Sequence, residues 1–214
     1  MVTMTASITH CWKNAWLDLV GLLLCASLAC LFHGPAQAQA PAPVISQLHF
    51  EHADESVLLT ATVKFELSSV VEDALLKGVA MIFVADANIF RKRWYWTNKR
   101  VAGAQRHMRL AYQPLTRRWR LNVASDVITH AGMSMALNQH FDSLPDALTA
   151  MQRMYRWKIA DAAALDLEQG HLVEFSFRLD ISQLPRPLQI GTLGQSDWNI
   201  SASARLPLVL ENSK

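Results

Sequence analysis

The stretch VLLTATVKFEL, Val57–Leu67, decides the fold, because its side chains alternate between apolar and polar. Its odd-numbered positions are all apolar, whereas Thr60, Thr62 and Lys64 stand at even-numbered ones. A period of two is typical of a β-strand with one buried face and one face in water. The sequence therefore predicts a fold built from strands of this kind.

Strand signals continue on both sides of this stretch. Val79–Ala85 is continuously apolar, which is typical of a central strand buried on both faces. Turn-forming residues follow at 97–99 (TNK) and 114–116 (PLT), and Gly103 is a candidate β-bulge. The remaining predicted strands are Val44–Phe50, Ile89–Trp96, Gln105–Gln113, Arg117–Ala124, Leu172–Asp180 and Asn199–Leu210.

Two short helices are predicted between the strands. Ser69 and Glu72 have the spacing of a capping box, and Gly78 stands where a helix C-terminus favours glycine. Ser143 is a candidate N-cap for the second helix, with Pro145 in its first turn. Helical spacing within the second helix is shown by Ala147, Leu148, Met151, Met154 and Tyr155. Together these signals predict a mainly β protein, a single-domain antiparallel β-sandwich with two short helices.

The first forty residues differ from the rest. Leu19–Phe32 is an uncharged apolar run that would form a helix of about 21 Å, shorter than the ~30 Å hydrocarbon core of a membrane. Ala36 and Ala38 follow with one residue between them, the small-x-small pattern of a signal-peptidase site. We therefore expect a signal peptide at 1–38, an Ala/Pro spacer at 39–43, and one β-rich domain at 44–214 in the periplasm.

Two other fates of the leader remain open. An uncleaved leader would anchor the protein in the membrane, because Trp16 and Leu17 can extend the apolar run. The segment SLAC approaches a lipobox, which would make Cys30 a lipidated residue, although Ser27 stands where such boxes carry a large aliphatic residue. With the leader cleaved, no transmembrane span is expected to remain.

The mature chain is expected to contain no cysteine, since the three cysteines of the sequence all lie in the leader, at Cys11, Cys25 and Cys30. Disulfides, thiolate catalysis and Cys-ligated zinc are thereby excluded. His49 and His52 would point to opposite faces of a strand, which is poor geometry for a metal. We therefore expect no metal and no cofactor.

The charges of the mature chain are segregated along the sequence. Residues 87–125 contain ten Lys or Arg and no Asp or Glu. The other mature residues carry a net charge of −8, so the overall charge of +2 conceals a basic segment and an acidic remainder. Such a segment indicates either an anionic partner or a solvated face that the acidic remainder neutralises.

Side-chain parity predicts that arginines of this segment share one face. In the predicted strand Ile89–Trp96, the residues Phe90, Trp94 and Trp96 occupy the face expected to be core. A meander of three strands would gather the opposite-facing arginines on a solvent face; they are Arg91, Arg93, Arg109, Arg118 and Arg120. We expect this face to bind an anionic envelope component, such as a lipid headgroup, a lipopolysaccharide phosphate or a glycan polymer, or an acidic periplasmic protein. Nucleic acid is not expected, because the leader predicts export.

An envelope hydrolase is an alternative hypothesis. The residues GMSMA at 132–136 resemble a nucleophile elbow, with Ser134 as nucleophile and His130 or His140 as base. The motif requires a strand before it and a helix after it, whereas the sequence here indicates a loop that enters a strand. We therefore expect no catalytic residue, and a purely structural role in the envelope is the third hypothesis.

Five segments in this order resemble one protein family. They are RKRWYW (Arg91–Trp96), RLAYQPLTRRWRL (Arg109–Leu121), FDSLPDAL (Phe141–Leu148), SQLPRPLQI (Ser182–Ile190) and SDWNIS (Ser196–Ser201). The chain thereby resembles the DUF4390 family, proteobacterial proteins with a signal peptide and a domain of unknown function, some of them called proline-rich signal peptide proteins. Such proteins are often encoded beside a membrane sensor kinase of the nitrogen-regulation type, so the resemblance implies an envelope-facing or signalling accessory role. It implies no catalytic residue.

Overall fold

The computed structural model describes residues 41–95, 97–125, 137–166, 170–192 and 195–212. These residues all belong to the unit Gln39–Lys214. Within these ranges, no helix has the length and apolar character that crossing a membrane requires.

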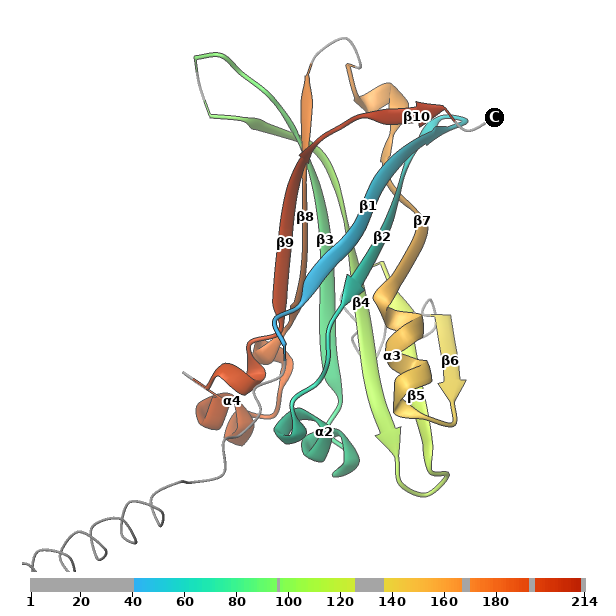
Figure 1. Cartoon of the computed structure of the whole chain (residues 1–214), viewed down its shortest axis with the longest axis vertical. Helices are drawn as coiled ribbons and strands as arrows, with labels where there is room; N and C mark the ends of the chain where they lie inside the picture. Colours follow the sequence, from blue (N-terminus) through green and yellow to red (C-terminus); the bar gives the residue numbers. More distant parts are fainter. Residues whose placement is uncertain (1–40, 96, 126–136, 167–169, 193–194, 213–214) are drawn as a thin grey trace, which may run out of the picture. The chain divides into compact units, whose positions relative to one another are not determined.

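The described strands form two sheets, which Figure 1 shows as two layers. The four-stranded sheet has the order β10-β1-β2-β7 and consists of β1 (Val44–Ala53), β2 (Ser56–Lys64), β7 (Arg153–Asp161) and β10 (Leu210–Asn212). The six-stranded sheet has the order β6-β5-β4-β3-β8-β9 and consists of β3 (Met81–Arg91), β4 (Lys99–Gln113), β5 (Arg118–Ala124), β6 (Leu137–Phe141), β8 (His171–Leu179) and β9 (Ser201–Pro207). Neighbouring strands are antiparallel, except that β1 and β10 are parallel. The predicted mainly β, antiparallel sandwich is confirmed.

The core lies between the two sheets. Its centre contains three buried rings: Phe65 just after β2, Phe83 on β3 and Phe177 on β8. Their ring centroids are 5.0 to 5.7 Å apart. The residue that follows β2 of the four-stranded sheet therefore packs directly on β3 and β8, two neighbouring strands of the six-stranded sheet. The apolar residues whose alternation predicted β2 lie in this core, because the odd-numbered residues from Val57 to Val63 are at most 1% exposed.

The first helix is α2 (Ser69–Leu76), and its N-cap lies one residue before the predicted position. Ser68 has an extended backbone, and its hydroxyl accepts a hydrogen bond from the backbone N–H of Val71 at 3.3 Å. Glu72 is therefore too far along the helix to complete a capping box, and that prediction was wrong. Gly78 follows the helix with φ of +87°, as its predicted C-terminal position requires.

The second helix, α3 (Leu144–Gln152), begins at the predicted cap Ser143 but ends earlier than expected. Met154 and Tyr155 belong instead to β7, which pairs with β2 and was not predicted. Two register shifts in this pairing and a positive φ at Arg156 break the alternation that would have indicated a strand. A third helix, α4 (Arg186–Thr192), and three short 3₁₀ helices complete the described elements; the latter are η2 (Ala162–Ala164), η3 (Ile181–Gln183) and η4 (Ser196–Trp198).

The two strands predicted at Val79–Ala85 and Ile89–Trp96 are one continuous strand, β3, which ends at Arg91. This strand lies inside the six-stranded sheet, with β4 on one side and β8 on the other. The bulge expected at Gly103 lies at Val101, where the pairing of β3 with β4 shifts register. Because β3 ends before Lys92, the residues that follow it are no longer constrained by strand parity.

Candidate anion-binding surfaces

The predicted meander exists, since β3, β4 and β5 are consecutive neighbours in the six-stranded sheet. On β5, Trp119 and Leu121 are buried, and Arg118 and Arg120 lie on the opposite face, as predicted. Arg109 of β4 is opposite Asn122 of β5 and so lies on that same outer face. We call Arg109, Arg118 and Arg120 the sheet-face cluster.

Arg91 and Arg93 are far from this cluster. Arg91 is opposite Lys99 at the end of β3, whereas Arg109 is opposite Ile82, nine positions back along the strand. At about 3.4 Å per residue, this places Arg91 about 30 Å from the cluster. Arg93 is beyond the strand altogether. The five predicted arginines therefore form two surfaces, and the expectation of a single face was wrong.

The sheet-face cluster is partly engaged with its surroundings. Arg118 forms an ion pair with Asp142 at 2.9 Å, and both side chains are more than half exposed. Arg120 donates hydrogen bonds of 3.1 Å to the amide oxygens of Asn122 and Asn138. These contacts hold the guanidinium groups across β5 and β6, so this surface is an ordered polar layer.

The second surface is the end of the hairpin that β3 and β4 form, which we call the hairpin tip and define as residues 91–95 and 97–100. Figure 1 shows this hairpin extending from the sheet at the end opposite to α2. The tip carries five cations, of which all but the half-buried first one are exposed: Arg91, Lys92, Arg93, Lys99 and Arg100. No ion pair involves them among the residues that the structure describes.

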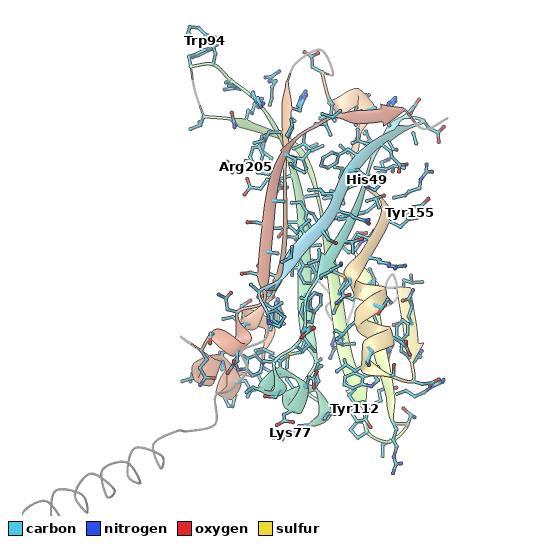
Figure 2. All side chains as sticks on the ribbon, viewed as in Figure 1. His49, Lys77, Trp94, Tyr112, Tyr155 and Arg205 are labelled. Carbon is cyan, nitrogen blue, oxygen red and sulfur yellow. The ribbon has the colours of Figure 1, made fainter. Side chains whose placement is uncertain are left out.

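Two aromatic side chains lie at the end of the hairpin tip. Trp94 is 92% exposed and Tyr95 is 67% exposed. Their ring centroids are 4.8 Å apart in an edge-on arrangement, and Figure 2 shows Trp94 at the extremity of the hairpin. The prediction that Trp94 belongs to the core was therefore wrong, because the strand that would have oriented it ends at Arg91. Trp96, also expected in the core, lies outside the described residues.

Carboxylates on the outer face of the six-stranded sheet bind arginines outside the basic segment. Asp86 of β3 accepts hydrogen bonds from Arg178 of β8 and from Gln105 of β4. Glu174 of β8 accepts one from Arg205 of β9 at 2.6 Å. These two carboxylates of the sheet are thus already paired with other arginines, and they do not neutralise the cations of the hairpin tip.

Arg106 also belongs to the basic segment, but its even-numbered position on β4 puts its side chain on the face of the sheet that is turned toward the core. It is opposite Ala85 on the inner face of β4, and its guanidinium lies 4.8 Å from the ring centre of Trp157 on β7. Burial lowers the pKa of Arg106, although an arginine retains its charge in proteins. Arg106 shares parity with the buried Met108 and Leu110, a signal that was present in the sequence.

The residues of the hydrolase hypothesis are not brought together by any described contact. Ser134 and His130 lie outside the described residues. His140 is exposed on β6, opposite Arg120. In the ranges that the structure describes, no three His, Cys, Asp or Glu side chains are grouped to hold a metal.

The fold and these surfaces define a two-sheet β-sandwich protein with a basic, aromatic-tipped hairpin. The chain belongs to the family described as "Domain of unknown function (DUF4390)", whose sequence model matches residues 40–206. The resemblance carried by the five sequence segments is thereby confirmed. No curated protein and no solved structure matches the chain.

Proposed function

We propose that this protein is a non-enzymatic binding module of the periplasm. It presents the arginines of the hairpin tip and of the sheet-face cluster to an anionic envelope component or to the periplasmic domain of a sensor kinase. One observation carries the proposal. Of the ten cations in the acid-free segment 87–125, only Arg118 forms an ion pair in the described part of the chain.

Electrostatics explains why such an arrangement serves binding. Arg91 and Lys99 are directly opposite each other on β3 and β4, which destabilises the sheet by roughly 0.2–1 kcal/mol, and a bound anion removes this cost. The two surfaces are about 30 Å apart, several times the ~8 Å Debye length at physiological salt. They therefore act independently on partners in solution, and each can be tested on its own.

The test compares four variants of the purified protein in which arginines become glutamine, and one of them, the five-arginine variant, combines the changes at both surfaces. R91Q/R93Q removes the two tip arginines that precede Trp94, and R109Q/R118Q/R120Q removes the sheet-face cluster. R153Q/R186Q is the matched control for the first, because it removes two exposed arginines outside the segment and changes the net charge equally. Binding is measured to isolated envelope fractions over a series of salt concentrations.

We expect salt-sensitive binding that at least one of the two segment variants weakens and the control retains. The five-arginine variant should bind least, with a shallower dependence on salt. Undiminished binding by the five-arginine variant, or an equal loss in R153Q/R186Q, would show that these arginines are not the binding surface.

A further inference from the structure

We propose that the hairpin tip is a membrane-contact element that inserts Trp94 and Tyr95 into the headgroup layer of an anionic lipid bilayer. This inference rests on the proposed function and names its anionic component as lipid. It concerns the tip alone; the sheet-face cluster remains free to bind another anion.

The first argument is the exposure of the two rings. A tryptophan that is 92% exposed, beside a tyrosine that is 67% exposed, makes no use of its apolar surface within the described fold. Among the described residues, the ring contact that each of them makes is with the other, at 4.8 Å between centroids. Trp and Tyr are the side chains enriched at membrane–water interfaces, where the ring is buried and the N–H or O–H remains hydrated.

The second argument is the order of chemistry along the hairpin. The aromatic rings are at the apex, and the cations follow nearer the sheet on both arms, at 91–93 and 99–100. Arg91 is three residues from Trp94, so the Cα atoms of these two residues lie within about 11 Å of each other. A bilayer presents the same order, with apolar chains beneath a phosphate layer, and each nearby Lys or Arg strengthens attachment to anionic lipid.

The third argument is that the base of the tip is held in place. β3 is paired on both sides up to its last residue, with Lys99 of β4 and His171 of β8 opposite Arg91. The backbone N–H of Lys92 then donates to the carbonyl of Gly170 at 3.0 Å. The rings are thus presented on an ordered support, which lowers the entropy lost on insertion.

A convex tip suits a lipid surface better than a protein surface. An acidic protein partner would need a cavity to cover both rings and carboxylates on two sides of it, whereas a bilayer deforms around the tip and supplies phosphate on every side. The cations also flank the rings on both arms, which matches a planar anionic layer rather than a one-sided patch.

The experiment measures flotation of the purified protein with phosphatidylcholine vesicles that contain or lack phosphatidylglycerol. W94A/Y95A tests the rings. Its control is L115A/Y155A, which removes two exposed apolar side chains elsewhere, since Leu115 is fully exposed and Tyr155 is 74% exposed. R91Q/R93Q and its control R153Q/R186Q test the charges. Thermal unfolding of each variant checks that it is folded.

We expect binding only to vesicles that contain phosphatidylglycerol, weakened by salt. W94A/Y95A should lower the vesicle partition coefficient at least about tenfold, because burial of even one such side chain contributes that much. R91Q/R93Q, measured on its own, should also lower the partition coefficient by at least about an order of magnitude, because each Lys or Arg near an anionic surface contributes about 1 kcal/mol. Both control variants should bind like the unchanged protein.

Each other result overturns the inference in a recognisable way. If W94A/Y95A binds as well as the unchanged protein, the rings do not insert, although loss in R91Q/R93Q would leave the proposed function standing. Binding to envelope fractions without binding to phosphatidylglycerol vesicles would overturn the phospholipid assignment and identify the partner as a protein, a glycan or lipopolysaccharide. If neither arginine set affects binding to any of these, the proposed function fails as well.

Discussion

Gly103 is a sensitive test of the β3–β4 geometry that supports the hairpin tip. A Cβ at this position would lie 2.7 Å from the side-chain oxygen of Asn88 and 2.9 Å from the carbonyl oxygen of Ala87. It would also lie 2.7 Å from the guanidinium of Arg100, which can move because it ends a flexible side chain. The backbone of β3 cannot move in the same way, since β8 holds it from the other side.

The expected free-energy change of Gly103→Ala combines two terms. Alanine is favoured over glycine in a strand by about 0.5–1 kcal/mol, whereas overpacking of a well-packed site costs about 1–3 kcal/mol. The overpacking cost exceeds the gain, so we expect a net destabilisation of about 1–2 kcal/mol. For a domain of this size, that lowers Tm by about 2–8 °C.

Gly170→Ala is the matched control, because the same chemical change there meets only the Lys92 side chain at an ordinary 3.8 Å. It should be neutral or stabilising by up to about 1 kcal/mol. Urea unfolding followed by circular dichroism measures both variants. A Gly103→Ala protein as stable as the unchanged one would refute the close approach of β3 and β4, and with it the ordered support of the tip.

Three further predictions concern stability. Phe83→Ala should lower the free energy of unfolding by about 3–5 kcal/mol, because it empties the centre of a three-ring cluster; a loss below about 1 kcal/mol in urea titration would contradict this packing. Ser68→Ala should cost about 1 kcal/mol or more, because its hydroxyl caps α2 and also donates to the carbonyl of Asp197, while Ser68→Thr, whose hydroxyl can make both bonds, should retain more of the stability in the same titration. Arg118→Ala should change the free energy of unfolding by less than about 1 kcal/mol, because its ion pair with Asp142 is exposed, and thermal melts at low and high salt should differ little.

The strands that could be predicted are those with long, uninterrupted alternation. β2 follows its parity from end to end and β5 follows it from Arg118 to Leu121, so that Arg118 and Arg120 lie on the expected face. β7 was missed because its bulges, with Arg156 in a left-handed conformation, destroy the period. Alternation in the sequence predicts a strand only where that strand contains no bulge.

The candidate site was predicted in composition but not in arrangement. The acid-free segment was evident from the sequence, yet nothing in its pattern marks Arg91 as the last residue of β3. Where a strand ends depends on how far its neighbours extend, and His171 of β8 provides that limit from 80 residues further along the chain. The exposure of Trp94 follows from this long-range pairing and could not be read locally.

The parallel pairing of β1 with β10 has a consequence for the timing of folding. Phe50 is opposite Leu210, so the stretch of β1 from Phe50 to His52 is covered by residues that are synthesised 160 positions later in the chain. Until then β1 has an open edge, with backbone groups available to any other extended chain. The four-stranded sheet therefore cannot be completed before β10 has been synthesised, and until that point each new molecule passes through an interval in which β1 is open to a chaperone or to another extended chain.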